Sequence, residues 1–294
     1  MQRISYYHVF LLILLSFIWG SSFSAIKLAV DELTPLQIAF ARVLFAALTL
    51  WASSLIFTLN WPRKAYNWGI LCAIALFSSA LPFSLISWAS EREDSSTVSI
   101  LMASAPIFAV LVSHFFTGDE ELNRYKTLGV VLGFCGVLIL LVPDLNFSAK
   151  GTASAKIATL LAALSYVISG VLTRKLTETL SAQSIATFVL SISTLILGAA
   201  LLFEPATLPS SLSETSMIAI VYLGIIATAI AQLLRYSLIL QVGYSFVSYI
   251  GFLIPVFALL IGVLWLDESL SLLSLCALAL VLIALALAKL GGNR

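Results

Sequence analysis

Apolar stretches long enough to cross a lipid bilayer recur from one end of the chain to the other. A transmembrane helix needs about 20 apolar residues in succession to span roughly 30 Å of hydrocarbon. Of the 294 residues, 61% are hydrophobic and only 10% are charged, whereas soluble domains carry about 25% charged residues. The composition therefore excludes a soluble globular domain and predicts an all-α polytopic membrane protein.

Turn residues and charged residues divide the chain into ten predicted transmembrane helices joined by short loops. The helices are expected at about residues 8–29, 36–57, 68–90, 95–117, 126–142, 154–173, 183–203, 215–240, 245–266 and 271–290. The first apolar run continues to Val30 without a clear cleavage site, so it is interpreted as an uncleaved helix. Cys72, Cys135 and Cys276 fall inside predicted helices and are expected to be small core residues, since they indicate neither a disulfide framework nor a metal cluster.

The basic residues favour one side of the membrane. An even number of helices puts both termini on the same side, and nine lysines and arginines then fall in the segments on that side. Only Arg92, Lys150 and Lys156 fall on the other side, together with ten of the fourteen acidic residues. Because cytoplasmic segments are enriched in Lys and Arg, the sequence predicts a multi-pass protein of the bacterial inner membrane with both termini in the cytoplasm.

The second half of the sequence repeats features of the first. The segment "SSTVSILMASAPIFAVL" (95–111) matches "YSFVSYIGFLIPVFALL" (244–260) at two serines, a valine and a proline, with an offset of 149 residues. The chain is therefore expected to divide into residues 1–143 and 144–294, each with five helices. An odd number of helices makes the second half insert upside down, and inverted repeats build alternating-access transporters with a substrate site near the membrane midplane.

Four segments resemble the EamA family of the drug/metabolite transporter superfamily. They are "FIWGSSFSAIKLA" (17–29), "PLQIAFARVLFAAL" (35–48), "APIFAVL" (105–111) and "IPVFALLIGVLWLDESLS" (254–271), and the resemblance covers essentially the whole chain. It implies ten helices and the export of small metabolites, which in several members are amino acids. The second half departs from the first, with Tyr166 in place of Trp19 and Val189 in place of Arg42, so a strictly symmetric site is not expected.

Polar residues in the predicted helices fall into stripes that should face the interior, because lipid offers them no partner. In the eighth predicted helix, Gly224, Thr228, Gln232 and Arg235 share one face at helical spacing. This stripe favours a cavity-lining Arg235 over one that extends to the membrane interface. For Lys27 and Arg42, which lie in the outer third of their helices, both interpretations stay open.

No Asp or Glu lies well inside a predicted helix. Ion-coupled carriers usually keep such a carboxylate, so substrate is expected to move down its own gradient. Cations, hydroxyls and aromatic rings instead suit a substrate that carries a carboxylate, to which Arg offers two parallel hydrogen bonds. The candidate binding residues are Trp19, Phe23, Lys27, Arg42, Trp88, Ser99, Tyr166, Thr228, Gln232, Arg235, Tyr236 and Tyr249.

Pro106 and Pro255 occupy matching places in the two halves. Each removes a backbone donor, which leaves the carbonyls of Met102 and Gly251 without their helical partners. Kinks are therefore expected at both prolines, where they would act as hinges during gating.

The sequence thus predicts a secondary transporter that exports small metabolites, above all amino acids or related carboxylates, by alternating access. One alternative is a carrier for phosphorylated metabolites, with Lys27, Arg42 and Arg235 as phosphate ligands. A membrane-embedded enzyme would need a nucleophile with a base or a metal cluster, whereas His8 and His114 are far apart, so no enzyme is expected. A scaffold is a further alternative. The expected partners are a small-molecule substrate and the lipid bilayer, with no cofactor, nucleic acid or obligatory protein partner.

Overall fold

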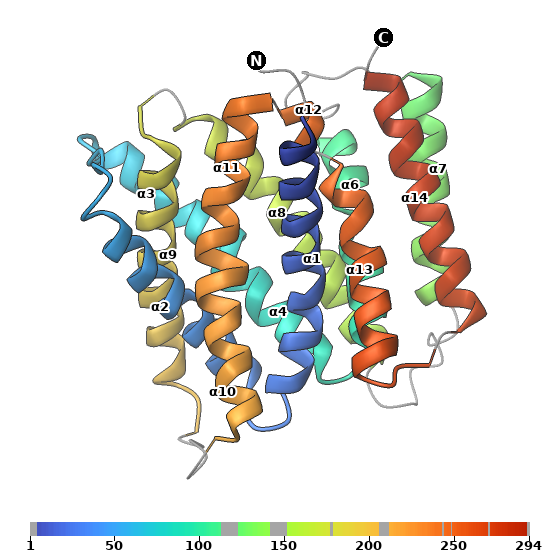
Figure 1. Cartoon of the computed structure of the whole chain (residues 1–294), viewed down its shortest axis with the longest axis horizontal. Coiled ribbons are helices and arrows are strands. Elements are labelled where there is room, and N and C mark those ends of the chain that lie inside the picture. Colours follow the sequence, from blue (N-terminus) through green and yellow to red (C-terminus); the bar gives the residue numbers. More distant parts are fainter. Residues whose placement is uncertain are drawn as a thin grey trace.

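A computed structural model describes residues 5–112, 123–141, 152–176, 179–205, 212–242, 244–247, 249–269 and 271–292. All regular secondary structure in these residues is helical (Figure 1). Eight helical segments are long and apolar enough to cross a membrane, and two further apolar helices are shorter. The prediction of an all-α membrane protein with about ten helices is confirmed.

The first half of the chain forms five apolar segments. They comprise α1 (Tyr6–Ala29), α2 (Pro35–Ser53), a third segment made of α3 (Ala65–Ala75), the π-helix η1 (Leu76–Ala80) and α4 (Leu81–Ser90), a fourth made of α5 (Ser95–Met102) and α6 (Ala105–Val112), and α7 (Arg124–Leu141). Local sequence explains where α2 begins. Thr34 accepts a hydrogen bond from the backbone of Gln37, whose side chain in turn bonds Thr34, and Pro35 fills the first helical position.

The second half forms five more segments. They comprise α8 (Thr152–Arg174), α9 (Ala182–Leu201), an eighth segment made of α10 (Glu214–Val221), the π-helix η4 (Tyr222–Ile230) and α11 (Ala231–Val242), a ninth containing α12 (Tyr244–Val247) and α13 (Ile250–Trp265), and α14 (Leu272–Gly292). The two π-helices thus interrupt the third and the eighth segments, five places apart. Such interruptions are uncommon and often mark functional sites.

Most of the tightest packing joins a helix of the first half to one of the second. α1 packs on α13, α2 on α9 and η4, α4 on α8, and α7 on α14. Two glycines permit close approach. A Cβ at Gly20 would lie 2.7 Å from the Cβ of Phe257, and one at Gly224 would lie 2.4 Å from the Cβ of Phe45. Small residues at such crossings let membrane helices pack backbone to backbone.

The cysteines do not lie in the core. Cys72, Cys135 and Cys276 are all exposed on the surface of the bundle, so the expectation that they are core residues is wrong. A thiol is small and only weakly polar, so it can face hydrocarbon as readily as it can fill a protein interior.

The two prolines sit differently in their helices. In the fourth segment, α5 ends at Met102 and α6 begins at Ala105, so Pro106 lies in a first helical turn, where its missing N–H matters little. Pro255 lies inside α13, which continues as a helix on both sides of it. The helix break in the fourth segment therefore precedes its proline, and the hinge role of both prolines stays a prediction.

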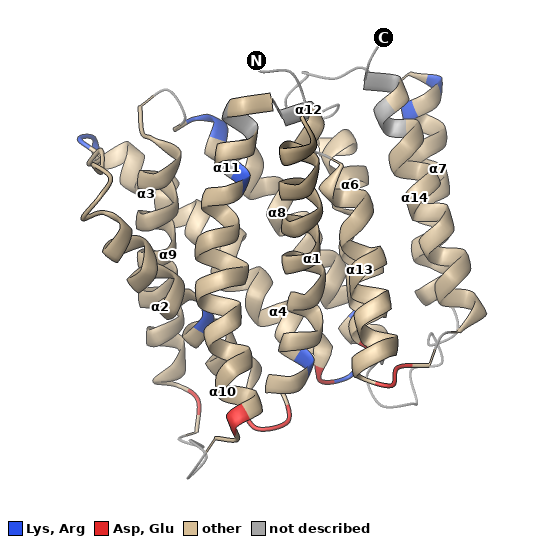
Figure 2. Cartoon of the chain, in the orientation of Figure 1, with Lys and Arg blue, Asp and Glu red and all other residues tan. Residues whose placement is uncertain are grey.

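The charged residues distinguish the two ends of the bundle. All acidic residues in the described part of the chain lie at the end away from the termini (Figure 2). We call this end the acidic face and the opposite end, where both termini lie, the terminal face. The residues concerned are Asp31, Glu32, Glu91, Glu93, Asp94, Glu204, Glu214, Asp267 and Glu268.

Candidate functional site

Arg42 lies in the interior of the bundle, on α2 and facing η4. Its side chain is only 7% exposed. Its Nε donates a hydrogen bond to Thr228 Oγ1 at 2.8 Å, and its guanidinium lies 3.9 Å from the ring centre of Phe83 on α4. The missing side chain at Gly224 brings α2 close enough to η4 for this hydrogen bond.

The two terminal nitrogens of Arg42 have no hydrogen-bond partner among the residues that the structure describes. A buried charge is normally paired and hydrogen-bonded, because losing its hydration is costly. The planar end of a guanidinium matches a carboxylate, to which it gives two parallel hydrogen bonds. Arg42 therefore has the chemistry of an anion-binding group whose anion would come from outside the protein.

Aromatic residues surround this guanidinium. Tyr166 on α8 packs against two of the hydrophobic clusters of the bundle, and both Tyr166 and Tyr222 are close enough to Arg42 to interact with its charge. We define Arg42, Phe83, Tyr166, Tyr222 and Thr228 as the central cluster. It combines one cation with apolar ring surface.

The π-helix η4 supplies two of these residues and the contacts that hold them. Thr228 Oγ1 donates to the Leu223 carbonyl, five residues earlier, at 2.7 Å. The Tyr222 hydroxyl donates to the carbonyl of Ile18 on α1 at 3.1 Å. Trp19, also on α1, donates from its indole nitrogen to the Ala227 carbonyl at 3.1 Å. The predicted residue Trp19 thus fixes α1 to the wide helical turns beside the central cluster.

Phe83 and Tyr222 were not among the predicted site residues. An isolated phenylalanine in an apolar helix carries no sequence signal for a site. Tyr222 lies outside the polar stripe expected for the eighth helix, because that stripe assumes regular α-helical spacing whereas η4 has wider turns.

Two further predicted residues are buried away from the terminal face. Phe23 belongs to the hydrophobic cluster around α1. Ser99 is fully buried on α5 and donates to the Ser96 carbonyl at 2.7 Å. The structure therefore gives Phe23 a packing position and Ser99 a local hydrogen bond.

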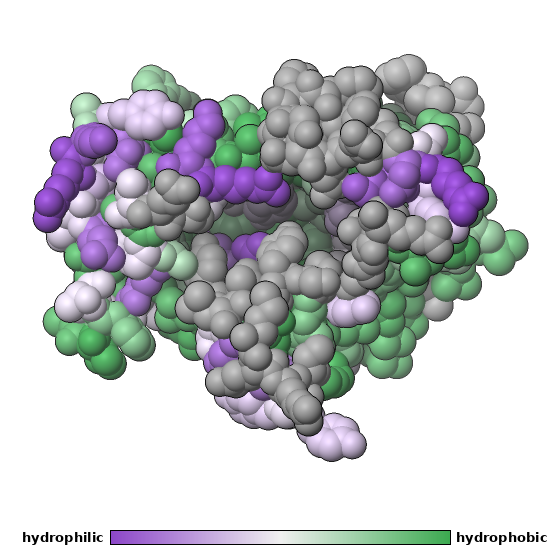
Figure 3. All heavy atoms as spheres, turned by 90° about the horizontal axis from the view of Figure 1, so that it is seen from above, coloured by the Kyte–Doolittle hydropathy of each residue, from purple (hydrophilic) through white to green (hydrophobic). Residues whose placement is uncertain are grey.

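Gln232 and Arg235 lie nearer the terminal face. Both are half-buried, and neither side chain has a hydrogen-bond or ion-pair partner in the described part of the chain. Seven residues of α-helix rise about 10 Å, so Arg235 lies too far along the axis from Thr228 to share one carboxylate with Arg42. Figure 3 shows that the terminal face is hollowed near its middle, with hydrophilic atoms along the rim.

Tyr236 and Tyr249 were also predicted to bind substrate. Tyr249 is exposed, and its ring makes an edge contact with Phe246. The side chain of Tyr236 lies outside the described residues. Neither is brought to the central cluster by the contacts that the structure describes.

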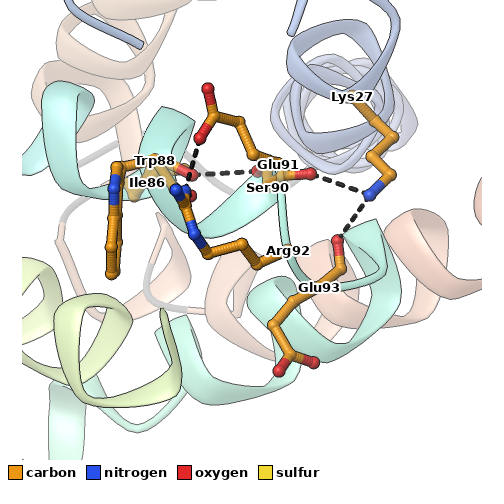
Figure 4. Close-up of polar contacts among 7 residues, drawn as sticks. All are labelled: Lys27, Ile86, Trp88, Ser90, Glu91, Arg92 and Glu93. Atoms are coloured by element: carbon orange, nitrogen blue, oxygen red, sulfur yellow. Dashed lines mark hydrogen bonds and ion pairs between the residues drawn. The ribbon is translucent and has the colours of Figure 1, made fainter. Parts of the chain in front are cut away.

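Lys27 and Trp88 lie at the acidic face, apart from the central cluster. Lys27 Nζ donates to the carbonyls of Ser90 at 2.8 Å and of Glu93 at 2.9 Å, so it ties α1 to the segment between α4 and α5 (Figure 4). Trp88 lies under the Arg92 guanidinium, 4.2 Å from its ring centre. Lysines that bind helix-end carbonyls are typical of structural ties.

Further hydrogen bonds tie the segments of the acidic face together. Glu32 accepts from the backbone N–H of Ser213, the N-cap of α10, at 2.8 Å, and hydrogen bonding from Ser213 lowers the pKa of Glu32 below its ordinary 4.5. Thr34 donates to the Glu204 carboxylate at 3.0 Å. The acidic face is thus closed by contacts between both halves of the chain.

A hollow of about 410 Å³ remains at the acidic face. It is lined by Lys27, Leu28, Asp31, Asp94, Leu266, Asp267, Glu268 and Ser269. Partial burial and the nearby charge of Glu268 raise the pKa of Asp94 above its ordinary 3.8. In the described part of the chain, no group of three or more His, Cys, Asp or Glu side chains is arranged to hold a metal ion.

Comparison with known proteins gives consistent matches. A model of the EamA-like transporter family matches residues 7–142 and, a second time, residues 153–290. The chain is similar to the uncharacterized transporter YoaV of Bacillus subtilis, with 23% identity over 265 residues that cover 88% of this chain and 89% of that protein. An uncharacterized transporter of Archaeoglobus fulgidus is 28% identical over 273 residues, covering 91% and 93%.

The chain is also similar to a plant protein and to a solved structure. A WAT1-related chloroplast protein of Arabidopsis thaliana is 26% identical over 279 residues, covering 92% of this chain and 66% of that protein. A crystal structure of a protein with 19% sequence identity superposes with a TM-score of 0.68 and covers 98% of both chains. This structural match supports the fold.

Proposed function

The chain belongs to the EamA-like transporter family of membrane transporters, and from this premise we propose that it exports small carboxylate-bearing metabolites, above all amino acids, by alternating access. The observation that carries the proposal is the state of Arg42. Arg42 is only 7% exposed, and within the described chain only the Nε of its guanidinium is hydrogen-bonded. A substrate carboxylate would supply the two acceptors that the terminal nitrogens lack.

The surroundings of Arg42 favour a carboxylate over a phosphate. A phosphate group carries up to two negative charges and is commonly bound by several cations. Lys27 is engaged by carbonyls at the acidic face, and Arg235 lies about 10 Å further along the eighth segment. One buried cation among aromatic rings suits a singly charged group attached to an apolar body.

Alternating access is supported by the symmetry of the packing. If the first five segments are exchanged with the last five, the contact of α1 with α13 maps onto that of α8 with α5 and α6, and the contact of α2 with η4 maps onto that of α9 with α3 and η1. Two copies of one family unit, at residues 7–142 and 153–290, fit the proposed division into inverted halves at residue 143.

The two faces of the bundle suit one stage of such a cycle. The acidic face is closed by hydrogen bonds, whereas the terminal face is hollowed (Figure 3). With both termini in the cytoplasm of a bacterial cell, this conformation would receive substrate from the inside. Arg235, half-buried nearer that face, would attract the carboxylate before it reaches Arg42.

The proposal is tested by solute flux in proteoliposomes, with a panel of amino acids competing against sugar phosphates. Arg42→Gln is expected to abolish flux and Arg42→Lys to keep a small part of it, because an ammonium lacks the planar fork. Arg63→Gln, which removes an exposed arginine, is the matched control.

Thermal unfolding of the same variants separates binding from structure. A buried charge with few partners adds little to stability, so the melting temperature of Arg42→Gln should be no lower than that of the parent protein. Normal flux in Arg42→Gln, or competition by sugar phosphates alone, would refute the carboxylate assignment.

A further inference from the structure

One acidic side chain joins the two segments that carry the repeated motif. Glu268 follows α13, yet its Oε1 accepts from the backbone N–H of Ser95 at 2.6 Å and its Oε2 from that of Ser96 at 3.1 Å. Both amides belong to the first turn of α5, so Glu268 caps a helix from another part of the chain. It thereby links the ninth segment to the fourth at the acidic face.

Gly262 of α13 leaves the space that this carboxylate occupies. The Glu268 backbone N–H donates to the Gly262 carbonyl at 3.1 Å, which folds the segment back onto the helix end. A Cβ at Gly262 would lie only 2.4 Å from Glu268 Oε2. Any larger residue there would therefore displace the carboxylate from the amides of α5.

Asp94 is the residue that the local sequence offers as the cap of α5. It occupies the N-cap position with extended backbone angles, and aspartate is among the preferred N-cap residues because its side chain accepts from the second or third amide of the helix. Here its side chain makes no capping hydrogen bond. It borders both the 410 Å³ hollow and a second one of about 210 Å³, so it has room to turn.

We propose that Glu268 is a latch that holds the acidic face closed, and that Asp94 replaces it as the cap of α5 when the face opens. Opening moves the end of α13 away from α5 and withdraws Glu268 from the amides of Ser95 and Ser96. Those amides have no partner within their own helix. Asp94 then accepts from Ser96 or Thr97, so α5 is capped in both states, and the balance between the two caps sets how often the face opens.

The latch rests on the proposed alternating access, but its test needs no substrate. Nitroxide labels at Glu91→Cys and Ser269→Cys, both exposed positions, report the distance between the end of α4 and the segment after α13. The three native cysteines are replaced by serine, and double electron–electron resonance in lipid nanodiscs measures the closed and open populations. A failed latch therefore leaves the Arg42 flux test unaffected.

Weakening the latch should open the acidic face. Glu268→Gln removes the charge and leaves one acceptor oxygen for the two backbone N–H groups, so it is expected to raise the open-to-closed ratio about fivefold. Gly262→Ala should raise it without changing any charge. Asp267→Asn is the matched control, since it removes a neighbouring charge and Asn tolerates the positive φ of 53° at that position. The latch is refuted if Glu268→Gln opens the face no more than Asp267→Asn.

Removing the replacement cap should have the opposite effect. In the Glu268→Gln chain, where the open population is largest, Asp94→Ala is expected to lower the open-to-closed ratio about fivefold. Asp94→Asn can still cap, so it should keep a larger open population than Asp94→Ala. Equal populations in the two Asp94 variants would overturn the role of Asp94 as a cap.

Discussion

Gly224→Ala tests whether the close approach of α2 to η4 positions the central cluster. The added Cβ would lie 2.4 Å from the Cβ of Phe45, 3.0 Å from the Arg42 carbonyl oxygen and 3.4 Å from the Ala46 nitrogen. Two of these neighbours are backbone atoms and the third is fixed to the backbone. The helices must therefore separate by about 1 Å to restore ordinary contacts.

The expected cost follows from this overlap. Overpacking of a closely packed core costs about 1–3 kcal/mol, and alanine regains at most about 1 kcal/mol through its higher helix propensity. With backbone on one side of the contact, the upper end applies, so the free energy of unfolding should fall by about 1–2 kcal/mol. The same 1 Å would lengthen the 2.8 Å hydrogen bond from Arg42 to Thr228 beyond about 3.5 Å, where it is lost.

Gly170→Ala is the matched control, because a Cβ at Gly170 meets nothing within 4 Å. This variant should be stabilised by up to about 1 kcal/mol and should transport normally. Unfolding of both variants in detergent micelles, followed by tryptophan fluorescence, measures stability, and proteoliposome flux measures function. If Gly224→Ala is as stable as Gly170→Ala, the close approach does not constrain the cluster and the reasoning is wrong.

In the Glu268→Gln chain, where the latch residue cannot itself take up a proton, acid is expected to close the acidic face. Partial burial raises the pKa of Asp94 above 3.8 in the closed structure, so the closed form binds the proton more tightly than an open form in which the Asp94 carboxylate accepts amide hydrogen bonds. In this Glu268→Gln chain, the distance between the two nitroxide labels should shift towards its closed value as the pH falls towards 3.8, and the same chain with Asp94→Asn added should not respond. The charged groups around Asp94 are Lys27, Asp31, Glu93, Lys156, Asp267 and Glu268. A second prediction concerns Arg235. Arg235→Ala should lower substrate flux severalfold, whereas Arg235→Lys should keep it, because attraction at the entrance needs a charge and not a planar fork. If Arg235→Lys loses as much flux as Arg235→Ala, Arg235 is instead a ligand of the substrate.

The helical architecture could be predicted from the sequence because hydrocarbon imposes a single requirement on every span. A backbone without water must satisfy its own hydrogen bonds, so a long apolar stretch becomes a helix whatever surrounds it. The placement of Cys72, Cys135 and Cys276 could not be predicted in this way. In a membrane protein both the core and the lipid-facing surface are apolar, so hydrophobicity does not say which side a small residue faces.

The central cluster could be predicted only in part. Arg42 and Thr228 were both candidates, but the sequence placed them 186 positions apart and suggested Arg235 as the continuation of the Thr228 stripe. Which helices meet depends on close approaches such as that at Gly224. The π-helix η4 depends on the same packing, since nothing in "YLGIIATAI" distinguishes it from an ordinary apolar helix.

The packing of early helices on late ones also constrains how the chain is assembled. Membrane insertion proceeds from the N-terminus, yet α1 packs on α13 and α7 on α14, two helices that are synthesised much later than their partners. After insertion, the first five segments therefore lie in the bilayer before their packing partners have been synthesised. Their interior faces, including the charge of Arg42 that is buried in the folded protein, lack these partners during that time. Loss of α14 removes the main partner of α7, so a shortened chain would be defective at a site some 130 residues before the truncation.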